Sequence, residues 1–272
     1  RDLVFGELDL MYKEDPVISK IVSEIVDGAG EYPSEQLANY GVRYVFLNEP
    51  VDKEVARKID GVGGLVRLSA TKDGVLLAFH DDDLMRTCGQ PGVISEMNYD
   101  EVRKFRIDGQ EPIPLMQEIF DAWPEAMVNI DCKADSALLP LTSALRGSGI
   151  LDRVCIGSFS DKRIATLRET FGPALCTSLG PREVAKLRVR SWVGPARSFP
   201  GAYAAQVPHK QGPLTITDKK FVEEAHQSGL KVHVWTIDDP IEMNVLFDLG
   251  VDGIMTDRPQ VLKDVMIERG IW

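Results

Sequence analysis

The sequence predicts an α/β fold, a TIM (β/α)8 barrel carrying a β-hairpin after its second strand and a helical extension at its N-terminus. Eight short apolar runs alternate with helical patterns between Val42 and Thr256, which is the pattern of a parallel sheet covered by helices. The length of 272 residues is also close to the roughly 250 residues of such a barrel. No repeat or linker interrupts the alternation, so we expect an extension over residues 1–40 and one barrel domain over 41–272.

The extension shows one amphipathic helix and a short second helix that starts at Pro33-Ser34 and runs through Leu37. Apolar residues recur at helical spacing from Val17 to Val26 and stop near Gly28, which favours a helix. Glu7 and Asp9 form an acidic pair without a strand pattern around it, so we interpret them as surface residues and not as metal ligands.

The barrel is expected to begin with a β-α-β unit. Val42–Leu47 reads as a buried strand, a helix follows over residues 51–59, and Leu65–Ser69 reads as the second strand. This pattern predicts two adjacent parallel strands of one closed barrel, with Asn48 and Glu49 at the carboxyl end of the first.

A hairpin follows the second strand directly. Asp73-Gly74 is a strong turn signal, and the apolar run from Val75 to Phe79 returns from it to deliver His80 and Asp81, with further acid at Asp82 and Asp83. A histidine held beside carboxylates at a strand end is suited to proton transfer near pH 7. The alternative is an ordinary surface histidine in an acidic loop.

The rest of the chain continues the alternation of strands and helices. The further strands are expected at residues 127–131, 154–157, 174–178, 204–207, 231–235 and 253–256. The helices between them are expected at residues 115–123, 136–145, 162–170, 182–187, 218–227 and 241–249.

Active sites of such barrels lie at the carboxyl ends of the strands. Asp131 and Lys133 lie two residues apart on one strand, so their side chains share a face and could hold a cation and a phosphate oxygen; an internal ion pair is the alternative. Trp235 could wall the pocket, or could be a core residue. His233 on the same face is interpreted as an interior histidine. The other residues at strand ends are Arg67, Ser69, Ser158, Phe159, Ser178, Gln206 and Asp257.

Composition restricts the partners. The net charge of −11 argues against nucleic acid, and a phosphate-bearing substrate then requires locally concentrated positive charge. No apolar run reaches the roughly 20 residues that span a bilayer. The four cysteines form no Cys-x-x-Cys pair, which favours reduced thiols and a cytoplasmic location. The chain starts at Arg1 with neither a methionine nor a signal sequence, which suggests a fragment or a processed product.

From about Ala70 onward the chain resembles the glycerophosphodiester phosphodiesterase family. The hairpin with His80-Asp81 carries the resemblance, together with the segments Glu111–Leu115, Asn129–Lys133, Gly157–Ser160, Val232–Thr236 and Gly250–Pro259. The first 69 residues lie outside this match; Tyr40–Val45 and Gly64–Ser69 resemble an extracytoplasmic part of actinobacterial membrane glycosyltransferases, which raises the possibility of a chimeric chain.

The resemblance implies a TIM barrel that hydrolyses glycerophosphodiesters, in lipid and glycerol metabolism, to an alcohol and sn-glycerol 3-phosphate. It implies two catalytic histidines, the second matching His80. It also implies a divalent cation, Mg²⁺ or Ca²⁺, held by three carboxylates, of which Asp131 matches the third. Lys133 and Trp235 are then substrate-binding residues, with Trp235 against the glycerol or other alcohol.

The chain departs from the family pattern before Ala70. It contains no His-Arg-Gly, which supplies the first histidine of the family, and Leu65 and Arg67 stand where the family has its Glu-x-Asp. Leucine and arginine cannot ligate a cation. We therefore expect Arg67 and Lys133 to hold a phosphate. The alternatives to an active hydrolase are a phosphodiester-binding pseudoenzyme and a non-functional chimera.

Overall fold

A nine-stranded sheet forms the centre of the molecule, and eight of its strands close into a barrel. The computed structural model describes residues 42–47, 62–122, 126–147, 149–194 and 198–271, so the predicted extension over 1–40 lies outside the described residues. The barrel strands are β1 (Val42–Leu47), β2 (Val62–Ala70), β6 (Met127–Cys132), β7 (Val154–Gly157), β8 (Cys176–Ser178), β9 (Ala202–Pro208), β12 (Lys231–Trp235) and β13 (Gly253–Thr256). Strand β1 pairs with both β13 and β2, which closes the sheet.

The direction of β1 differs from the prediction. From β2 to β13 the neighbouring strands of the barrel pair in parallel, but β1 is antiparallel to both of its neighbours. Leu47, its last residue, pairs with Gly253, the first residue of β13. Strand β1 therefore runs away from the carboxyl ends of the other strands; Asn48 and Glu49, which were expected at the carboxyl end of this strand, lie outside the described residues. An apolar run specifies a buried strand, but either direction satisfies the backbone hydrogen bonds.

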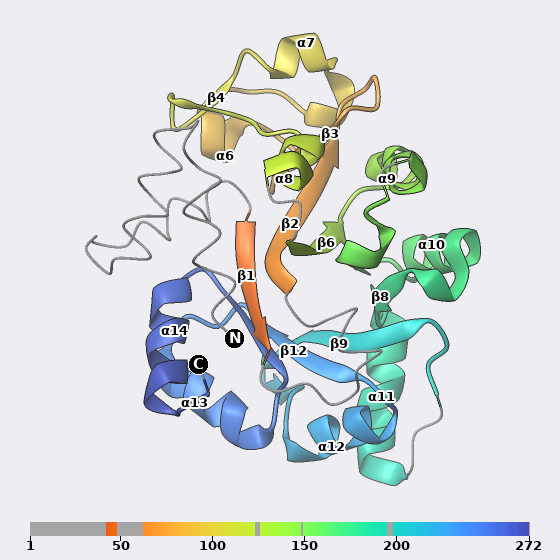
Figure 1. Ribbon diagram of the computed structural model, residues 1–272, viewed down its shortest axis with the longest axis vertical. Coiled ribbons are helices and arrows are strands. Elements are labelled where there is room, and N and C mark those ends of the chain that lie inside the picture. Colours follow the sequence, from red (N-terminus) through yellow and green to blue (C-terminus); the bar gives the residue numbers. More distant parts are fainter. Residues whose placement is uncertain (1–41, 48–61, 123–125, 148, 195–197, 272) are drawn as a thin grey trace.

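Helices cover the outside of the sheet (Figure 1). They are α8 (Met116–Ala122), α9 (Asp135–Gly147), α10 (Asp161–Phe171), α11 (Pro181–Val193), α12 (Lys219–Gln227), α13 (Pro240–Leu249) and α14 (Pro259–Glu268), with the short 3₁₀ helices η2 (Leu151–Arg153) and η3 (Gly172–Ala174). Six of them match the predicted ranges closely, except that α11 extends further; α14 adds a helix. Proline lies in the first turn of α11, α13 and α14, where its missing N–H costs nothing. None of the described helices is long and apolar enough to cross a membrane.

The predicted hairpin after β2 is present and opens a small excursion from the barrel, drawn in orange and yellow in Figure 1. Its elements are β3 (Leu76–Ala78), α6 (Met85–Cys88), η1 (Ile94–Glu96), α7 (Tyr99–Val102), β4 (Arg106–Ile107) and β5 (Glu111–Pro112). This excursion has a core of its own, which includes Leu77, Phe79 and Leu84. The core holds the residues that follow β3 against the end of the barrel.

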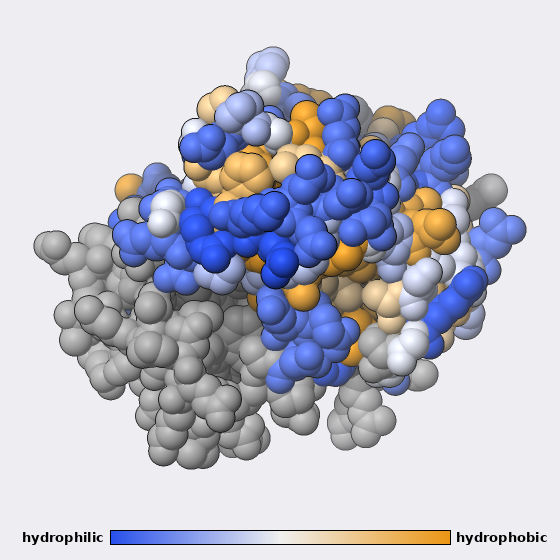
Figure 2. Space-filling model, turned by 90° about the horizontal axis from the view of Figure 1, so that it is seen from above, coloured by the Kyte–Doolittle hydropathy of each residue, from blue (hydrophilic) through white to orange (hydrophobic). Residues whose placement is uncertain are grey.

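A second excursion lies between β9 and α12. It contains the short antiparallel strands β10 (Lys210–Gln211) and β11 (Leu214–Thr215), which the sequence reading did not anticipate. The surface seen from above is largely hydrophilic, with apolar residues in several separate groups (Figure 2).

Candidate active site

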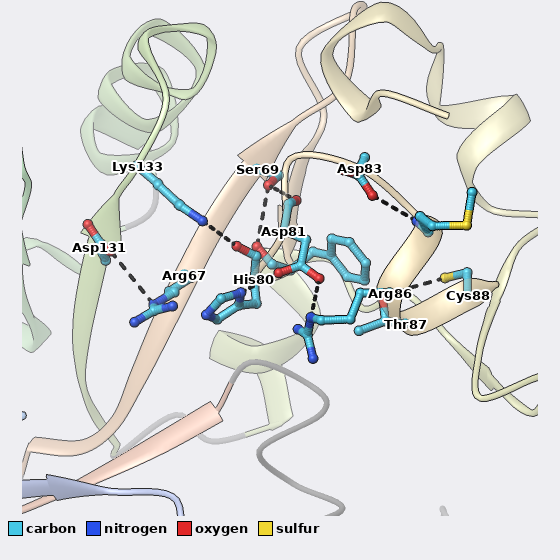
Figure 3. Close-up of polar contacts among 12 residues, drawn as sticks. Arg67, Ser69, His80, Asp81, Asp83, Arg86, Thr87, Cys88, Asp131 and Lys133 are labelled. Atoms are coloured by element: carbon cyan, nitrogen blue, oxygen red, sulfur yellow. Dashed lines mark hydrogen bonds and ion pairs between the residues drawn. The ribbon is translucent and has the colours of Figure 1, made fainter. Parts of the chain in front are cut away.

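Two opposite charges face each other across neighbouring strands at the mouth of the barrel. Arg67 on β2 is in register with Asp131 on β6, and the Arg67 Nε lies 3.8 Å from the Asp131 Oδ2 (Figure 3). Asp131 is only 9% exposed. The guanidinium therefore lies directly beside the carboxylate that the sequence analysis named as a metal ligand.

His80 follows β3 and is oriented by its neighbours. Its Nδ1 lies 2.5 Å from the Asp81 Oδ1, and the Arg86 Nε donates to the Asp81 Oδ2 at 2.7 Å. The Ser69 hydroxyl on β2 donates to the Asp81 carbonyl at 3.0 Å, so the barrel fixes the backbone at this point. Nδ1 is engaged with Asp81, so Nε2 is the ring nitrogen that this contact leaves unused.

The charge around His80 affects its protonation. Burial lowers the pKa of His80 below its usual value; the nearby Arg67 and Lys133 lower it further, while Asp81 acts in the opposite direction. Asp81 itself has a lowered pKa: burial opposes ionisation, but the hydrogen bonds from Arg86 and His80 outweigh it. A bound phosphate would offset the two cations and favour the protonated imidazole.

Lys133 lies between His80 and the pair formed by Arg67 and Asp131. It follows β6, and its Nζ donates to the His80 carbonyl at 3.2 Å (Figure 3). Two cationic side chains, Arg67 and Lys133, thus lie close enough to His80 to lower its pKa.

Hydrogen bonds from Ser158 and Arg163 hold the carboxyl end of β6 in place, and the sequence analysis did not predict them. The Ser158 hydroxyl donates to the Cys132 carbonyl at 2.6 Å and accepts from the Arg163 Nε at 2.9 Å. Arg163 also donates to Asp135 at 2.6 Å. The sequence analysis predicted neither Arg163 nor Arg86. The sequence does place Arg86 five residues after Asp81, and this spacing was a signal that could have identified it.

A cavity of about 370 Å³ opens beside this charged edge. Trp235 and Phe159 form a corner of it, with ring centroids 5.6 Å apart and an interplanar angle of 76°. Phe159 is 65% exposed, so an apolar ring faces the opening. The whole lining consists of Arg67, Asp131, Gly157, Ser158, Phe159, Ser178, Leu179, Pro181, Val184, Gln206, Val207, Pro208, Gln211, Ile216, Trp235 and Met255.

A polar layer inside the barrel adjoins the cavity through Gln206, which belongs to the lining. The Gln206 amide donates to Asn129 at 3.0 Å and lies 3.4 Å from the His233 Nδ1. His233 is completely buried, as expected of an interior histidine, and burial lowers its pKa to about 4. It is therefore neutral near pH 7.

The described residues do not fit a divalent cation. No group of three histidine, cysteine, aspartate or glutamate side chains able to hold a metal occurs among them. At Asp131 the neighbouring group is a guanidinium, which offers only donors and repels a cation.

The chain matches known proteins over most of its length. Residues 68–261 match the sequence profile of the glycerophosphoryl diester phosphodiesterase family. A probable glycerophosphodiester phosphodiesterase 2 of Mycobacterium tuberculosis is 32% identical, over 75% of this chain and 78% of that protein.

Solved structures share the fold. One is the glycerophosphoryl diester phosphodiesterase domain of a Mycobacterium tuberculosis protein, with a TM-score of 0.62, 17% identity, and coverage of 79% of this chain and 90% of that one. Another is an Oleispira antarctica phosphodiesterase in complex with its product sn-glycerol-3-phosphate, with a TM-score of 0.59, 17% identity, and coverage of 78% and 87%. From the profile match and the curated relative, the chain belongs to the glycerophosphoryl diester phosphodiesterase family.

Proposed function

We propose that this chain hydrolyses glycerophosphodiesters to an alcohol and sn-glycerol 3-phosphate. The observation that carries the proposal is the position of His80, held by Asp81 at the barrel edge that also carries Lys133 and Arg67. Membership of the family supports the reaction, and the product named for the Oleispira antarctica structure supports the substrate class.

The roles follow from the chemistry of each side chain. Arg67 and Lys133 hold the phosphate oxygens, since a guanidinium fork and an ammonium both donate to them. His80, through Nε2, donates a proton to the leaving alkoxide. Trp235, in the aromatic corner with Phe159, covers the carbon face of the glycerol.

A divalent cation, Mg²⁺ or Ca²⁺, is implied by the family, with Asp131 as one ligand. Among the described residues no group of three histidine, cysteine, aspartate or glutamate side chains could hold a metal, so the roles above rest on the groups of the chain itself.

The direct test is hydrolysis of a glycerophosphodiester by the wild type and by His80→Ala. General acid catalysis supplies about 10²–10⁴-fold in rate, so we expect His80→Ala to lose that factor. The matched control is His226→Asn, because His226 contacts Asp252 near the start of β12, at the edge opposite the mouth. An unchanged rate in His80→Ala removes His80 from the mechanism.

A second candidate is binding of the phosphodiester without turnover. The contact between Arg67 and Asp131 favours this second candidate. The guanidinium supplies positive charge for phosphate at the position where a metal would otherwise activate the reaction. Equilibrium dialysis with sn-glycerol 3-phosphate would then give binding from a preparation that shows no hydrolysis.

We also propose that the partner of this protein is a small-molecule phosphodiester and not nucleic acid. We further propose that the protein is located in a reducing compartment, the cytoplasm. All four cysteines are free thiols, and three of them are buried, which fits a reducing environment.

A further inference from the structure

A glycine lies next to the charged pair at the barrel mouth. Gly157 ends β7 and is in register with Asp131 on β6, which is in turn in register with Arg67 on β2. All three residues line the cavity. A Cβ at position 157 would lie 2.9 Å from the Gln206 Oε1 and 3.2 Å from the Ser178 Oγ. The glycine therefore leaves a small space open in front of two polar atoms.

The backbone does not require glycine at this position. Gly157 does not have a positive φ, so a residue with a Cβ could adopt the same conformation. What the glycine provides is space, because 2.9 Å lies well inside the van der Waals separation of a carbon and an oxygen. A methyl group at position 157 would displace the Gln206 amide and fill the space.

The Gln206 amide is held so that its oxygen faces this space. Its Nε2 donates to the Asn129 Oδ1 at 3.0 Å and lies 3.4 Å from the Nδ1 of the buried His233. Because the amide nitrogen is engaged inside the barrel, Oε1 is the atom that lies beside Gly157. An amide oxygen can only accept hydrogen bonds, so this atom requires a donor from a ligand.

The Ser178 hydroxyl supplies the complementary group. Ser178 ends β8 and is 2% exposed. A serine hydroxyl both donates and accepts. A ligand hydroxyl in front of Gly157 would therefore donate to the Gln206 Oε1 and accept from the Ser178 Oγ. A ligand methyl group at the same place would leave both buried protein atoms unpaired, which is unfavourable.

The distance from the phosphate-binding side chains suits glycerol. Neighbouring strands lie roughly 4.8 Å apart, so Gly157 on β7 is one spacing from Asp131 on β6 and two from Arg67 on β2. A phosphate held by Arg67 and Lys133 leaves the three-carbon chain to run along this edge toward Gly157. The hydroxyl that reaches the space is the terminal one, farthest from the phosphate.

We propose that Ser178 and Gln206 bind the terminal hydroxyl of the glycerol that stays on the phosphate, in the space left by Gly157. This inference rests on the proposed function and names the part of the substrate that the cavity distinguishes. The two side chains select a phosphodiester of glycerol over a phosphodiester of an alcohol that lacks this hydroxyl. No bond is made or broken at this hydroxyl.

The test compares two ligands by calorimetry. These are sn-glycerol 3-phosphate and 2-hydroxypropyl phosphate of the same configuration, which lacks only the terminal hydroxyl. Leaving buried hydrogen-bonding groups unpaired weakens binding roughly 10-fold or more, so we expect the wild type to prefer glycerol 3-phosphate by about that factor. Ser178→Ala should remove most of this preference and leave the affinity for 2-hydroxypropyl phosphate nearly unchanged, a result that misfolding of the mouth would not give.

A second variant tests the space itself. Gly157→Ala places a Cβ against the Gln206 amide and should also remove most of the preference. Gly147→Ala is its matched control, because the φ of Gly147 is not positive and an added Cβ would meet nothing within 4 Å. Ser136→Ala, at an exposed position of α9, is the control for Ser178→Ala. Both controls should keep the preference of the wild type.

The outcomes separate this inference from the proposed function. Equal affinities of the wild type for the two ligands overturn the hydroxyl inference alone, and so does a preference that Ser178→Ala and Gly157→Ala both leave unchanged. Failure of the wild type to bind either ligand overturns the proposed function as well.

Discussion

Arg67 sets the charge of the barrel mouth. Replacing it with Met removes a charged donor while the side chain still fills space beside Asp131. Hydrogen bonds to charged groups contribute about 1.5–3 kcal/mol, so we expect the affinity for glycerol 3-phosphate to fall roughly 10- to 100-fold. Arg182→Met is the control, since the Arg182 side chain is 91% exposed on α11. Equal affinities of wild type and Arg67→Met would exclude Arg67 from phosphate binding.

The pH dependence of hydrolysis reports on His80. A general acid works in its protonated form, and burial, the largest cause, lowers the pKa of His80. We therefore expect the rate to rise as the pH falls below about 6.5. In Arg86→Met the Asp81 carboxylate loses its guanidinium partner, so its negative charge acts more strongly on His80 and favours the protonated imidazole. The fall in rate with rising pH should then occur at higher pH than in the wild type. If the pH–rate profile of Arg86→Met is the same as that of the wild type, Asp81 does not control the protonation of His80.

His233 makes stability depend on pH in the acid range. Its pKa is lowered to about 4 by burial. Between about pH 6.5 and 4 the imidazole is therefore protonated in the unfolded chain and neutral in the folded chain. Stability therefore falls as the pH drops through this window, by about 3 kcal/mol in total. His233→Gln should remove this part of the slope in urea unfolding measured at several pH values. A slope identical to that of the wild type would contradict the burial of His233.

At the scale of single elements, the turn between β2 and β3 depends on Gly74. Its φ of +83° is unfavourable for residues with a Cβ, so Gly74→Ala should lower the free energy of unfolding by about 1 kcal/mol. Gly147 at the end of α9 is the control, because its φ is not positive and a Cβ there would meet nothing within 4 Å. Urea unfolding of both variants measures the difference, and equal stabilities would contradict the account of this turn.

Elements were predictable where the signal is local. The hairpin follows from Asp73-Gly74, and α14, which was not predicted, still has Leu262, Val265 and Met266 buried at helical spacing. The elements of the excursion after β3 have two to four residues each, too few for a period to emerge. The direction of β1 depends on its pairing with β13, which no local pattern encodes.

At the scale of the whole molecule, the barrel explains which site residues could be anticipated. The placement of Arg67, Asp131 and Lys133 near one another could be anticipated because strand ends gather at one edge of the fold, and His80 was anticipated from the hairpin; their catalytic and binding roles stay predictions. The supporting arginines were not, because their partners are distant in sequence: Arg163 contacts Asp135, and Arg188 contacts Asp218. Such pairs depend on how helices pack, so a single sequence carries no signal for them.

The central claim is that the described mouth of this barrel recognises the phosphate of a glycerol phosphodiester through its own cationic side chains. The most direct measurement is calorimetric titration of the purified protein with glycerol 3-phosphate, Mg²⁺ and Ca²⁺, each separately. The charges of Arg67 and Lys133 outweigh that of Asp131, so the account predicts binding of glycerol 3-phosphate in the absence of metal and no tight binding of either cation. Tight binding of a cation, with glycerol 3-phosphate binding only in its presence, would contradict it.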